Sequence, residues 1–532
     1  MDTEIPRMVK FGRATIEDVP ASEFGNKAAS LACMNAMDIP VPPGFILGVS
    51  VCEDYYRDGN VLPGDVPALL REGITFLEKE TGRIFGSPRN PLLVSVRSGA
   101  PVSMPGIMET LLNIGLSRET IRGLILLTGN PRFAWDSYRR LLENFGTTVA
   151  SHDPARYRSL LKAKMEREEV CDETGLDAMT LQDLAREFEG IHLEGGGRPF
   201  PSDSFEQLLQ AGIAVLRSWS SPRAAAFRRL NLVQDARGTA ITVQAMVFGN
   251  MGIHSGAGVA FTRNPWTGEK DFVVDFRFGA QGEDVVSGES SAATCHELAR
   301  RMPAVFEGLV TSGRTLESHF RDMQDLEFTV QQEHLYILQS RSGKRSPLAA
   351  LRIAVEMVAE GLITPAEALD RLRDVDIDAI TIQSVLSREP PLAGGLSASS
   401  GAVSGTIALT SERAEEAAGE GTVILVRETA SPDDLPGISA AGGLLVARGA
   451  RTSHAAVVAR QMGKVCIVNC TALSIDTRRH RCRFGDCELR EGEVITLDGD
   501  SGQVYRGAVD VVRERPAELV GAVEEWRRSL VT

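Results

Sequence analysis

The sequence predicts a multidomain protein that combines α+β and α/β segments, and three observations support this fold class. The chain has 532 residues, enough for two to four domains with large buried cores. Helical patterns alternate with or precede short strand patterns through the first two thirds of the chain. A stretch rich in Gly, Ser and Ala, AGGLSASSGAVSG, then opens a second region of short strands and loops with one helix.

The first domain is expected to span residues 1–345. Residues 116–200 form a helical subdomain, because charges and apolar residues recur there at 3–4 spacing, as in ARYRSLLKAKMEREEV. The segment HLEGGGRPFPSDS is expected to close this subdomain as a loop. Helices then precede the strand patterns GTAITVQAMVFG, AGVAFTRNP, KDFVVDFRFG, DLEFTV and HLYILQS.

Residues 346–389 are expected to be a linker of two helices, with Pro365 at the first turn of the second helix. A compact domain of ordinary size follows at 390–509. Residues 510–532 are expected to end the chain as a charged helix, and the sequence indicates no partner surface for it.

Composition and charge restrict the partners of the protein. The hydrophobic share of 43% and the charged share of 24% are those of an ordinary globular protein. A net charge of −14 argues against nucleic acid and against an anionic membrane surface, because both recruit clustered Lys and Arg. No apolar run reaches the roughly 20 residues that span a bilayer, and the N-terminus has no signal-peptide pattern. We therefore expect a cytoplasmic enzyme.

Four cysteines lie close together near the end of the second domain: Cys466, Cys470, Cys482 and Cys487, with His480 among them. The C-x3-C and C-x4-C spacings lack the usual C-x2-C pattern of a zinc site. We expect buried thiols in a reducing compartment rather than a metal site or a disulfide framework.

A nucleotide site would have to be built without a P-loop, because the GxxxxGK[ST] pattern does not occur. Lys27 follows a Gly-Asn pair at the start of a helix, whose N-terminus favours anions. Arg97 ends an apolar strand. The segment from Ser103 to Gly115 is expected to begin as a loop that could cover phosphates and to continue as a helix. Taken singly, each cation also fits a solvated helix start or a surface ion pair.

A β-hairpin is expected at MQDLEFTVQQEHLYILQSRSGKR. Asp325, Glu327 and Thr329 share one face of its first strand, and Gln339 and Arg341 share a face of the second. If the strands pair, Glu327 and Gln339 can converge on one Mg²⁺ ion, because magnesium takes hard oxygen ligands. The alternative is a polar face exposed to water.

The segment from Gly442 to Lys464, GGLLVARGARTSHAAVVARQMGK, points to a nucleophile. An apolar strand runs into a glycine loop, and Thr452 and Ser453 occupy capping positions before a helix. His454 follows in the first helical turn, where free backbone N–H groups suit a phosphoryl group on an imidazole nitrogen. The spacing alone also fits a capped helix with an incidental histidine.

The motifs, taken in order, resemble those of the pyruvate, phosphate dikinase family across nearly the whole chain. The matching stretches include FGNKAASL, LLVSVRSGAPVSMPGIMETLLNIGL, SGAGVAFTRNPWTGEK, MQDLEFTV, LQSRSGKR and GARTSHAAVVARQMGK. The resemblance implies an ATP-grasp-like nucleotide-binding domain followed by a swivelling β/β/α phosphohistidine domain. It also implies that His454 takes the β-phosphoryl of ATP while inorganic phosphate takes the γ-phosphoryl, giving AMP and pyrophosphate.

The resemblance also assigns residues. Lys27, Arg97 and Arg341 match phosphate-binding positions, and Glu327 and Gln339 match Mg²⁺-binding positions. The resemblance places Gln244 and Met246 on the adenine side. It places the SMPG loop, with Ser103, Met104 and Gly106, over the phosphates. It assigns Thr452 the role of orienting His454.

Five positions depart from the family pattern. Asp is expected where Glu109 stands, Thr where Ser340 stands, and Asn where Gly279 stands. Gly-Met is expected where Ala450 and Arg451 precede Thr452. Arg451 adds a cation beside the nucleophile, which could hold the phosphoryl group or point into solvent.

The family also carries a C-terminal barrel that binds pyruvate or phosphoenolpyruvate, and such a barrel needs a few hundred residues. Only 23 residues follow position 509, so we expect the barrel to be absent from this chain. A separate barrel protein, a different phosphoryl acceptor, a truncated form and a non-catalytic regulatory paralogue remain alternatives. A homodimer is a further expectation.

Overall fold

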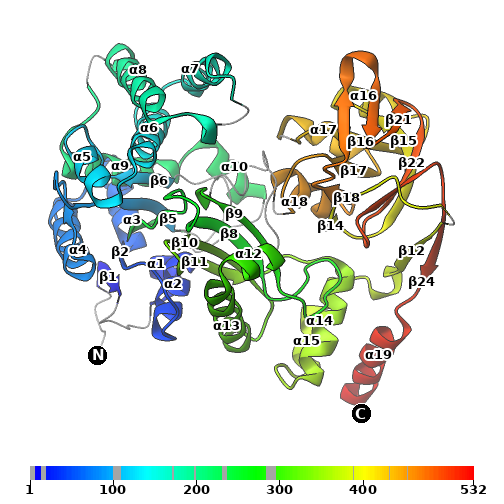
Figure 1. The fold of residues 1–532 in the computed structure, drawn as a ribbon. Helices are drawn as coiled ribbons and strands as arrows, with labels where there is room; N and C mark the ends of the chain where they lie inside the picture. The colour runs from blue at the N-terminus through cyan, green and yellow to red at the C-terminus, as the bar shows by residue number, and fades with distance from the viewer. Residues whose placement is uncertain are drawn as a thin grey trace. The chain divides into compact units, whose positions relative to one another are not determined.

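A computed structural model describes residues 6–12, 19–99, 110–170, 173–196, 199–230, 237–282, 295–387, 389–430, 432–451 and 453–531. Figure 1 shows the order of the elements along the chain. The chain divides into two compact units. The first contains Met1–Gly252 and Tyr336–Gln339, and the second contains Ile253–Leu335 and Ser340–Thr532. Each unit is described by itself.

The first unit is built on a five-stranded sheet with the order β1-β2-β7-β5-β6, in which every neighbouring pair is antiparallel. Its strands are β1 (Met8–Phe11), β2 (Gly44–Leu47), β5 (Val94–Gly99), β6 (Thr110–Ile114) and β7 (Ala240–Ala245), and β3 (Ile84–Phe85) pairs separately with β4 (Pro91–Leu92). The central strand β7, AITVQA, is buried along its whole length because other elements cover both of its faces.

Helices complete the first unit. They are α1 (Ala21–Phe24), α2 (Asn26–Ala36), α3 (Val49–Arg57), α4 (Val66–Thr81), α5 (Thr120–Thr128), α6 (Pro131–Thr148), α7 (Pro154–Arg167), η1 (Glu173–Gly175), α8 (Ala178–Gly196), α9 (Ser204–Ser218) and α10 (Pro222–Leu230). The helix expected toward Gly115 was wrong, because Thr110–Ile114 form strand β6 and pair with β5. The expectation of a loop from His192 was wrong at its start, because α8 continues to Gly196. His192 is buried, and its Nε2 lies 2.9 Å from the Leu142 carbonyl oxygen, which holds this turn in the helix.

The second unit begins with a four-stranded sheet of order β11-β10-β8-β9. Its strands are β8 (Gly256–Phe261), β9 (Val273–Phe278), β10 (Gln324–Gln331) and β11 (His334–Ser342), with the helices α12 (Cys295–Arg301) and α13 (Pro303–Phe320). Gln332 and Glu333 have φ values of 50° and 63°, the left-handed conformation that a two-residue hairpin turn requires. The hairpin and its strands therefore form as the sequence predicts.

The region after this sheet contains both expected helices and further structure. Its elements are α14 (Pro347–Ala359), α15 (Pro365–Arg371), η2 (Ile377–Ala379), β12 (Ile382–Leu386), β24 (Asp510–Glu514) and α19 (Ala517–Val531), and β12 pairs antiparallel with β24. The final helix does have a partner surface, contrary to expectation. Val520 and Val523 are buried in the same apolar cluster as Ala354 and Met357 of α14, because LVGAV gives α19 an apolar face.

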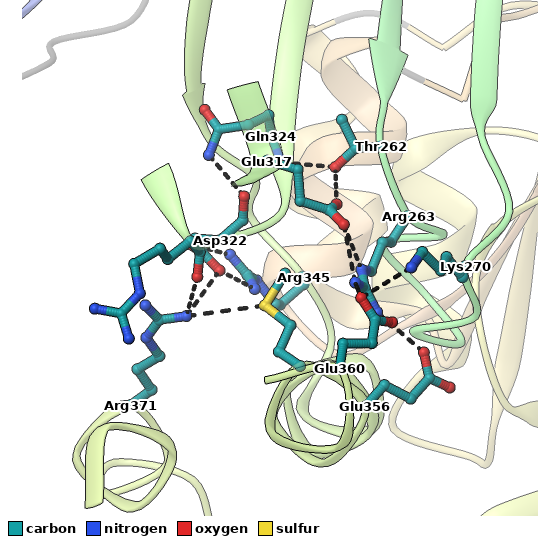
Figure 2. Close-up of polar contacts among 12 residues, drawn as sticks. Thr262, Arg263, Lys270, Glu317, Asp322, Gln324, Arg345, Glu356, Glu360 and Arg371 are labelled. Carbon is teal, nitrogen blue, oxygen red and sulfur yellow. Dashed lines mark hydrogen bonds and ion pairs between the residues drawn. The ribbon is translucent and has the colours of Figure 1, made fainter. Parts of the chain in front are cut away.

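A buried cluster of charges ties α14 to the sheet of the second unit (Figure 2). Arg263 follows β8 and its side chain is 0% exposed. Its guanidinium lies 2.8 Å from Glu317 of α13, 3.1 Å from Glu356 of α14 and 2.8 Å from Glu360. Burial alone would lower the pKa of Arg263, but the carboxylates of Glu317 and Glu360 raise it above its ordinary value. The arginine is therefore charged and held from three sides.

The remainder of the second unit is an eight-stranded sheet of order β13-β23-β22-β15-β16-β17-β18-β14. Its strands are β13 (Ala393–Gly394), β14 (Leu396–Ser399), β15 (Ala402–Ala408), β16 (Val423–Arg427), β17 (Gly443–Val446), β18 (Val465–Val468), β22 (Val494–Asp498) and β23 (Gln503–Arg506). Strands β15 to β18 are parallel to one another.

A smaller antiparallel sheet and short helices surround these strands. They are β19 (Leu473–Asp476), β20 (Arg481–Phe484), β21 (Cys487–Arg490), α16 (Ser411–Ala417), α17 (Leu435–Ala440), α18 (His454–Gln461), η3 (Pro432–Asp434) and η4 (Thr477–Arg479). Only one helix was expected here, so α16 and α17 are additions. The cap that starts α16 is supplied by Thr410, whose hydroxyl accepts a hydrogen bond from the Arg413 N–H.

Candidate active site

Lys27 and Arg97, the two predicted phosphate-binding residues of the first unit, lie on the elements that the sequence predicts. Gly25 has a φ of 83° and ends α1, so that α2 starts at Asn26 with Lys27 in its first turn. Arg97 lies on β5, opposite Thr242 of β7 and Thr110 of β6. Both cationic side chains are partly buried. This unit therefore offers one cation at a helix N-terminus and one on a sheet face, a suitable set for phosphate oxygens.

The two adenine-side candidates lie on and after β7. Gln244 is 1% exposed, and its Nε2 donates to the Pro42 carbonyl at 2.9 Å. Met246 donates its backbone N–H to the Leu93 carbonyl at 2.9 Å, and its side chain packs partly buried against the core. The side-chain amide of Gln244 thus supports the sheet, and the roles of both residues in binding adenine stay predictions.

An ion-pair cluster around the buried Asp325 occupies the hairpin of the second unit. Arg341 Nε donates to Asp325 Oδ2 at 2.9 Å, and Arg341 Nη2 lies 3.7 Å from Glu327 Oε1. Burial would lower the pKa of Arg341, but Asp325 and Glu327 raise it. Burial raises the pKa of Asp325, with the charge of Arg341 acting in the opposite direction. The face predicted for Asp325 and Glu327 is therefore turned toward a cation, and Asp325 does not face water.

Asp325 is a functional candidate that the sequence did not single out beyond its strand face. Its Oδ1 is buried and finds no hydrogen-bond partner among the described residues. Glu327 beside it keeps a side chain that is 34% exposed. These oxygens are the hard donors that Mg²⁺ prefers, so this half of the predicted metal site fits the ion. Gln339 belongs to the residues grouped with the first unit, and its part in the site stays a prediction.

His454 begins α18 at the carboxyl end of parallel strand β17, as the sequence predicts. Ser453 caps the helix: its hydroxyl accepts a hydrogen bond from the Ala456 N–H at 3.4 Å. In α/β sheets, loops at the carboxyl ends of parallel strands carry ligands and reacting groups. The backbone of residue 454 is therefore placed where a phosphoryl group would meet a helix N-terminus.

Some predicted residues lie outside the described part of the chain. These are Ser103, Met104 and Gly106 of the SMPG loop, Glu109 beside it, and Thr452 before the capping serine. Their roles stay predictions.

Arg451 does not point into solvent, so that alternative was wrong. Its side chain is 14% exposed, and its Nε donates to Asp275 Oδ1 of β9 at 3.2 Å. Of the other departures from the family pattern, Ser340 donates its hydroxyl to Gln324 Oε1 at 2.8 Å, and Gly279 has a φ of 66°. A residue with a side chain would be strained at position 279.

The cysteine group near the end of the second domain is largely buried. Cys466, Cys470 and Cys482 are each buried, and burial raises the pKa of the Cys466 thiol to about 12. His480 Nδ1 instead lies 2.6 Å from Glu491 Oε2. Within the described ranges, no three His, Cys, Asp or Glu side chains are grouped as a metal site.

No helix in those ranges is both long and apolar enough to cross a membrane.

Two sequence families match the chain. "Pyruvate phosphate dikinase, AMP/ATP-binding domain" matches residues 60–307 and 304–361, and "PEP-utilising enzyme, mobile domain" matches residues 419–502. The second family covers β17, α18 and His454.

Curated relatives agree with these matches. The chain is 42% identical over 508 residues to pyruvate, phosphate dikinase 1, chloroplastic, of Arabidopsis thaliana. It is 41% identical over 507 residues to the pyruvate, phosphate dikinase of Clostridium symbiosum, and 42% identical over 518 residues to that of Rhizobium meliloti. Each match covers 94% of this chain but only 53–58% of the relative's length. The first family spans more than half of the chain, and the protein therefore belongs to the pyruvate phosphate dikinase family.

Proposed function

We propose that the protein transfers the β-phosphoryl group of ATP to its own His454, with inorganic phosphate as acceptor of the γ-phosphoryl. The observation that carries this proposal is the place of His454 at the start of the capped helix α18, at the carboxyl end of parallel strand β17. Membership of the pyruvate phosphate dikinase family supports the choice of donor.

Each phosphoryl transfer in the proposed reaction breaks one phosphorus–oxygen bond for each bond that it forms. A lone pair of the neutral His454 imidazole bonds to the β-phosphorus, and the bond from that phosphorus to the α,β-bridging oxygen breaks, releasing AMP. An oxygen of inorganic phosphate bonds to the γ-phosphorus as the bond to the β,γ-bridging oxygen breaks, giving pyrophosphate. The proton on the other ring nitrogen passes to solvent. Thr452 and the first backbone N–H groups of α18 orient the ring and its phosphoryl group.

The cations serve the charge that develops on the phosphoryl oxygens. In the ATP-grasp-like arrangement that we propose, Lys27, Arg97 and Arg341 bind phosphate oxygens. Asp325 holds the Arg341 guanidinium in place, which fixes the direction of its free N–H donors. We assign the SMPG loop, with Ser103, Met104 and Gly106, the role of covering the phosphates.

Glu327 and Gln339 would hold Mg²⁺, with Asp325 as a neighbouring carboxyl. When bound, the ion neutralises charge on the nucleotide phosphates. Arg341 lies close enough to Glu327 to position its carboxylate before the ion arrives. On the adenine side, we assign binding to Gln244 and Met246, where the backbone of Met246 offers a further carbonyl group.

The test uses ATP labelled at the β-phosphorus, with magnesium and with or without inorganic phosphate. We expect AMP rather than ADP, phosphate-dependent pyrophosphate, and an acid-labile label on the protein. His454→Ala should abolish the label. His480→Ala is the matched control, because His480 is an exposed histidine of the same region, paired with Glu491. A label that persists in His454→Ala contradicts the proposal, and nucleotide binding without AMP formation favours a regulatory role.

The destination of the phosphoryl group is also a proposal. The relatives are named for pyruvate and phosphate, and each is considerably longer than the region that this sequence matches. We propose pyruvate as the final acceptor, bound outside residues 1–532, either on a longer polypeptide or on a separate barrel protein. Transfer of the label from His454 to pyruvate by added candidate partners would test this. The cytoplasmic location and the homodimer stay predictions.

A further inference from the structure

Arg451, three residues before His454, reaches out of its own sheet to the first sheet of the second unit. Its Nε donates to Asp275 Oδ1 at 3.2 Å, and its Nη2 donates to the Val274 carbonyl at 3.5 Å. Both acceptors belong to β9. The Asp275 side chain is only 1% exposed, so the pair is largely shielded from water.

Trp266 and Arg460 add a second set of contacts to the same junction. The guanidinium carbons of Arg451 and Arg460 lie 5.4 Å and 5.1 Å from the centre of the Trp266 ring, within cation–π range. Arg460 donates from Nη2 to the Arg451 carbonyl at 3.1 Å and from Nε to the Ala398 carbonyl at 3.2 Å. Arg460 therefore fixes the loop before His454 to α18, while Trp266 packs beneath both arginines.

This junction is electrostatically connected to the hairpin of the candidate active site. Burial raises the pKa of Asp325, and the positive charges of Arg341 and, to a smaller extent, Arg460 act in the opposite direction. Arg460 lies on α18, the helix that begins with His454, and Asp325 is the partner of Arg341. In the structure in which Arg451 makes these contacts, α18 is therefore on the side of the Asp325–Arg341 ion pair of the same unit.

A phosphate-binding role for Arg451 does not agree with these contacts. A phosphoryl group would have to compete with Asp275, whose buried carboxylate would then be left beside a second anion. The Nε donor and the Nη2 donor are both already directed at β9.

We propose that Arg451 is a positioning residue that latches the His454 loop onto β9 through Asp275, and that this latch sets the rate at which His454 accepts phosphoryl from ATP. The proposal rests on the proposed function of His454. A single ion pair suits this role because separation returns both charges to water, which limits the cost of leaving.

The test is a double-mutant cycle with Arg451→Gln, Asp275→Asn and both together, read by single-turnover labelling of His454 at saturating ATP. If the residues act through each other, each single variant and the double variant should be slowed alike, by about tenfold. The dissociation constant of ATP should not change. Arg451→Lys should recover much of the rate, because it keeps the charge. Arg448→Gln is the matched control, since Arg448 is an exposed arginine of the same loop, paired with Glu428, and it should label normally.

Other outcomes overturn the latch. The two substitutions could instead slow the labelling of His454 independently, so that their effects multiply in the double variant. Arg451→Gln could also slow labelling where Asp275→Asn does not. Either result would indicate that Arg451 acts on the phosphoryl group. Hydrogen exchange gives a second readout if Asp275→Asn does not fold. Protection of the backbone around residues 273–278 and 454–457 should fall in Arg451→Gln and stay normal in Arg448→Gln; equal protection contradicts the latch. If the unmodified protein forms no phosphohistidine, the proposed function fails, and exchange still decides on the latch.

Discussion

Two arginines connect the first sheet of the second unit to later parts of the chain, and they do so in different ways. Arg263 is fully buried and contacts three carboxylates, from α13, α14 and the residue that ends α14 (Figure 2). Arg451 keeps 14% of its side chain exposed and pairs with one carboxylate, Asp275. If the contacts of Arg263 open, one buried arginine is separated from three carboxylates. If the contact of Arg451 opens, one arginine is separated from one carboxylate.

The difference indicates which junction is permanent. Around Arg263, Thr262 and Lys270 add contacts to Glu317 and Glu360, so α14 is fixed to the sheet. No comparable set of carboxylates among the described residues surrounds Arg451. We predict that swivelling of the His454 region originates after α14 and breaks the Arg451 contact.

The largest effect is expected from Arg263→Met. Removing the guanidinium leaves Glu317, Glu356 and Glu360 close together and partly buried, so the free energy of unfolding should fall by about 3–5 kcal/mol. Chemical denaturation measures this loss. Arg373→Gln is the control, because Arg373 is an exposed arginine paired only with its neighbours, and it should change stability by less than about 0.5 kcal/mol. Equal losses in both variants would contradict the comparison.

A smaller effect on stability is expected from Arg451→Gln. The substitution removes one partner of a shielded pair, but the His454 region can separate from β9 and solvate Asp275. The free energy of unfolding should fall by about 1–2 kcal/mol, below the loss for Arg263→Met. The same denaturation experiment measures it. A loss as large as that of Arg263→Met would mean that the junction is a fixed anchor rather than a latch.

Trp266→Phe should weaken the latch further while keeping an apolar ring in place. The indole Nε1 is buried and has no hydrogen-bond partner in the described structure, so its removal costs no hydrogen bond. The weaker attraction of both guanidinium groups to a phenyl ring should cost about 1 kcal/mol. We expect slower labelling of His454 with ATP affinity unchanged. A change in ATP affinity would contradict this assignment.

The smallest effect concerns pH and Asp500, in the turn between β22 and β23. Burial, then Asp498 and Glu269, raise the pKa of Asp500 to about 6 from its ordinary 3.8. The folded state therefore binds this proton more readily than the unfolded state. The resulting stability is fully present below about pH 4 and is lost as pH rises through about 6.

Asp500→Asn removes this titration. The variant should show a flatter dependence of unfolding free energy on pH between about 4 and 6, and slightly higher stability at pH 7 than the unmodified protein. Denaturation across that pH range measures both. Asp370→Asn, at an exposed position, is the control. An unchanged pH profile in Asp500→Asn would show that the surroundings of Asp500 do not raise its pKa.

Much of the candidate site follows from local sequence. The first turn of α2 with Lys27, the Asp325–Arg341 hairpin and the capped helix of His454 depend on contacts between residues close in the sequence. The strand of Arg97 was also predicted, from its apolar run, although its partner β7 lies far along the chain. Capping residues, glycine turns and strand alternation report such contacts directly. These elements were therefore predictable.

The remaining features depend on residues far apart in the chain. Arg451 and Asp275 are separated by 176 positions, and the partner surface of α19 lies on α14, some 165 residues earlier. One sequence shows an arginine beside a nucleophile and an apolar stripe on a helix, but not what either contacts.

The sequence by itself determined the strands, the helices and the chemical groups of the donor site, because these follow from periodicity and short-range hydrogen bonding. Only the tertiary structure decided that Arg263 contacts three carboxylates and that Arg451 turns toward β9. The physical reason is that burial and charge pairing are set by whichever distant segment packs against a side chain, and local patterns carry no record of that segment.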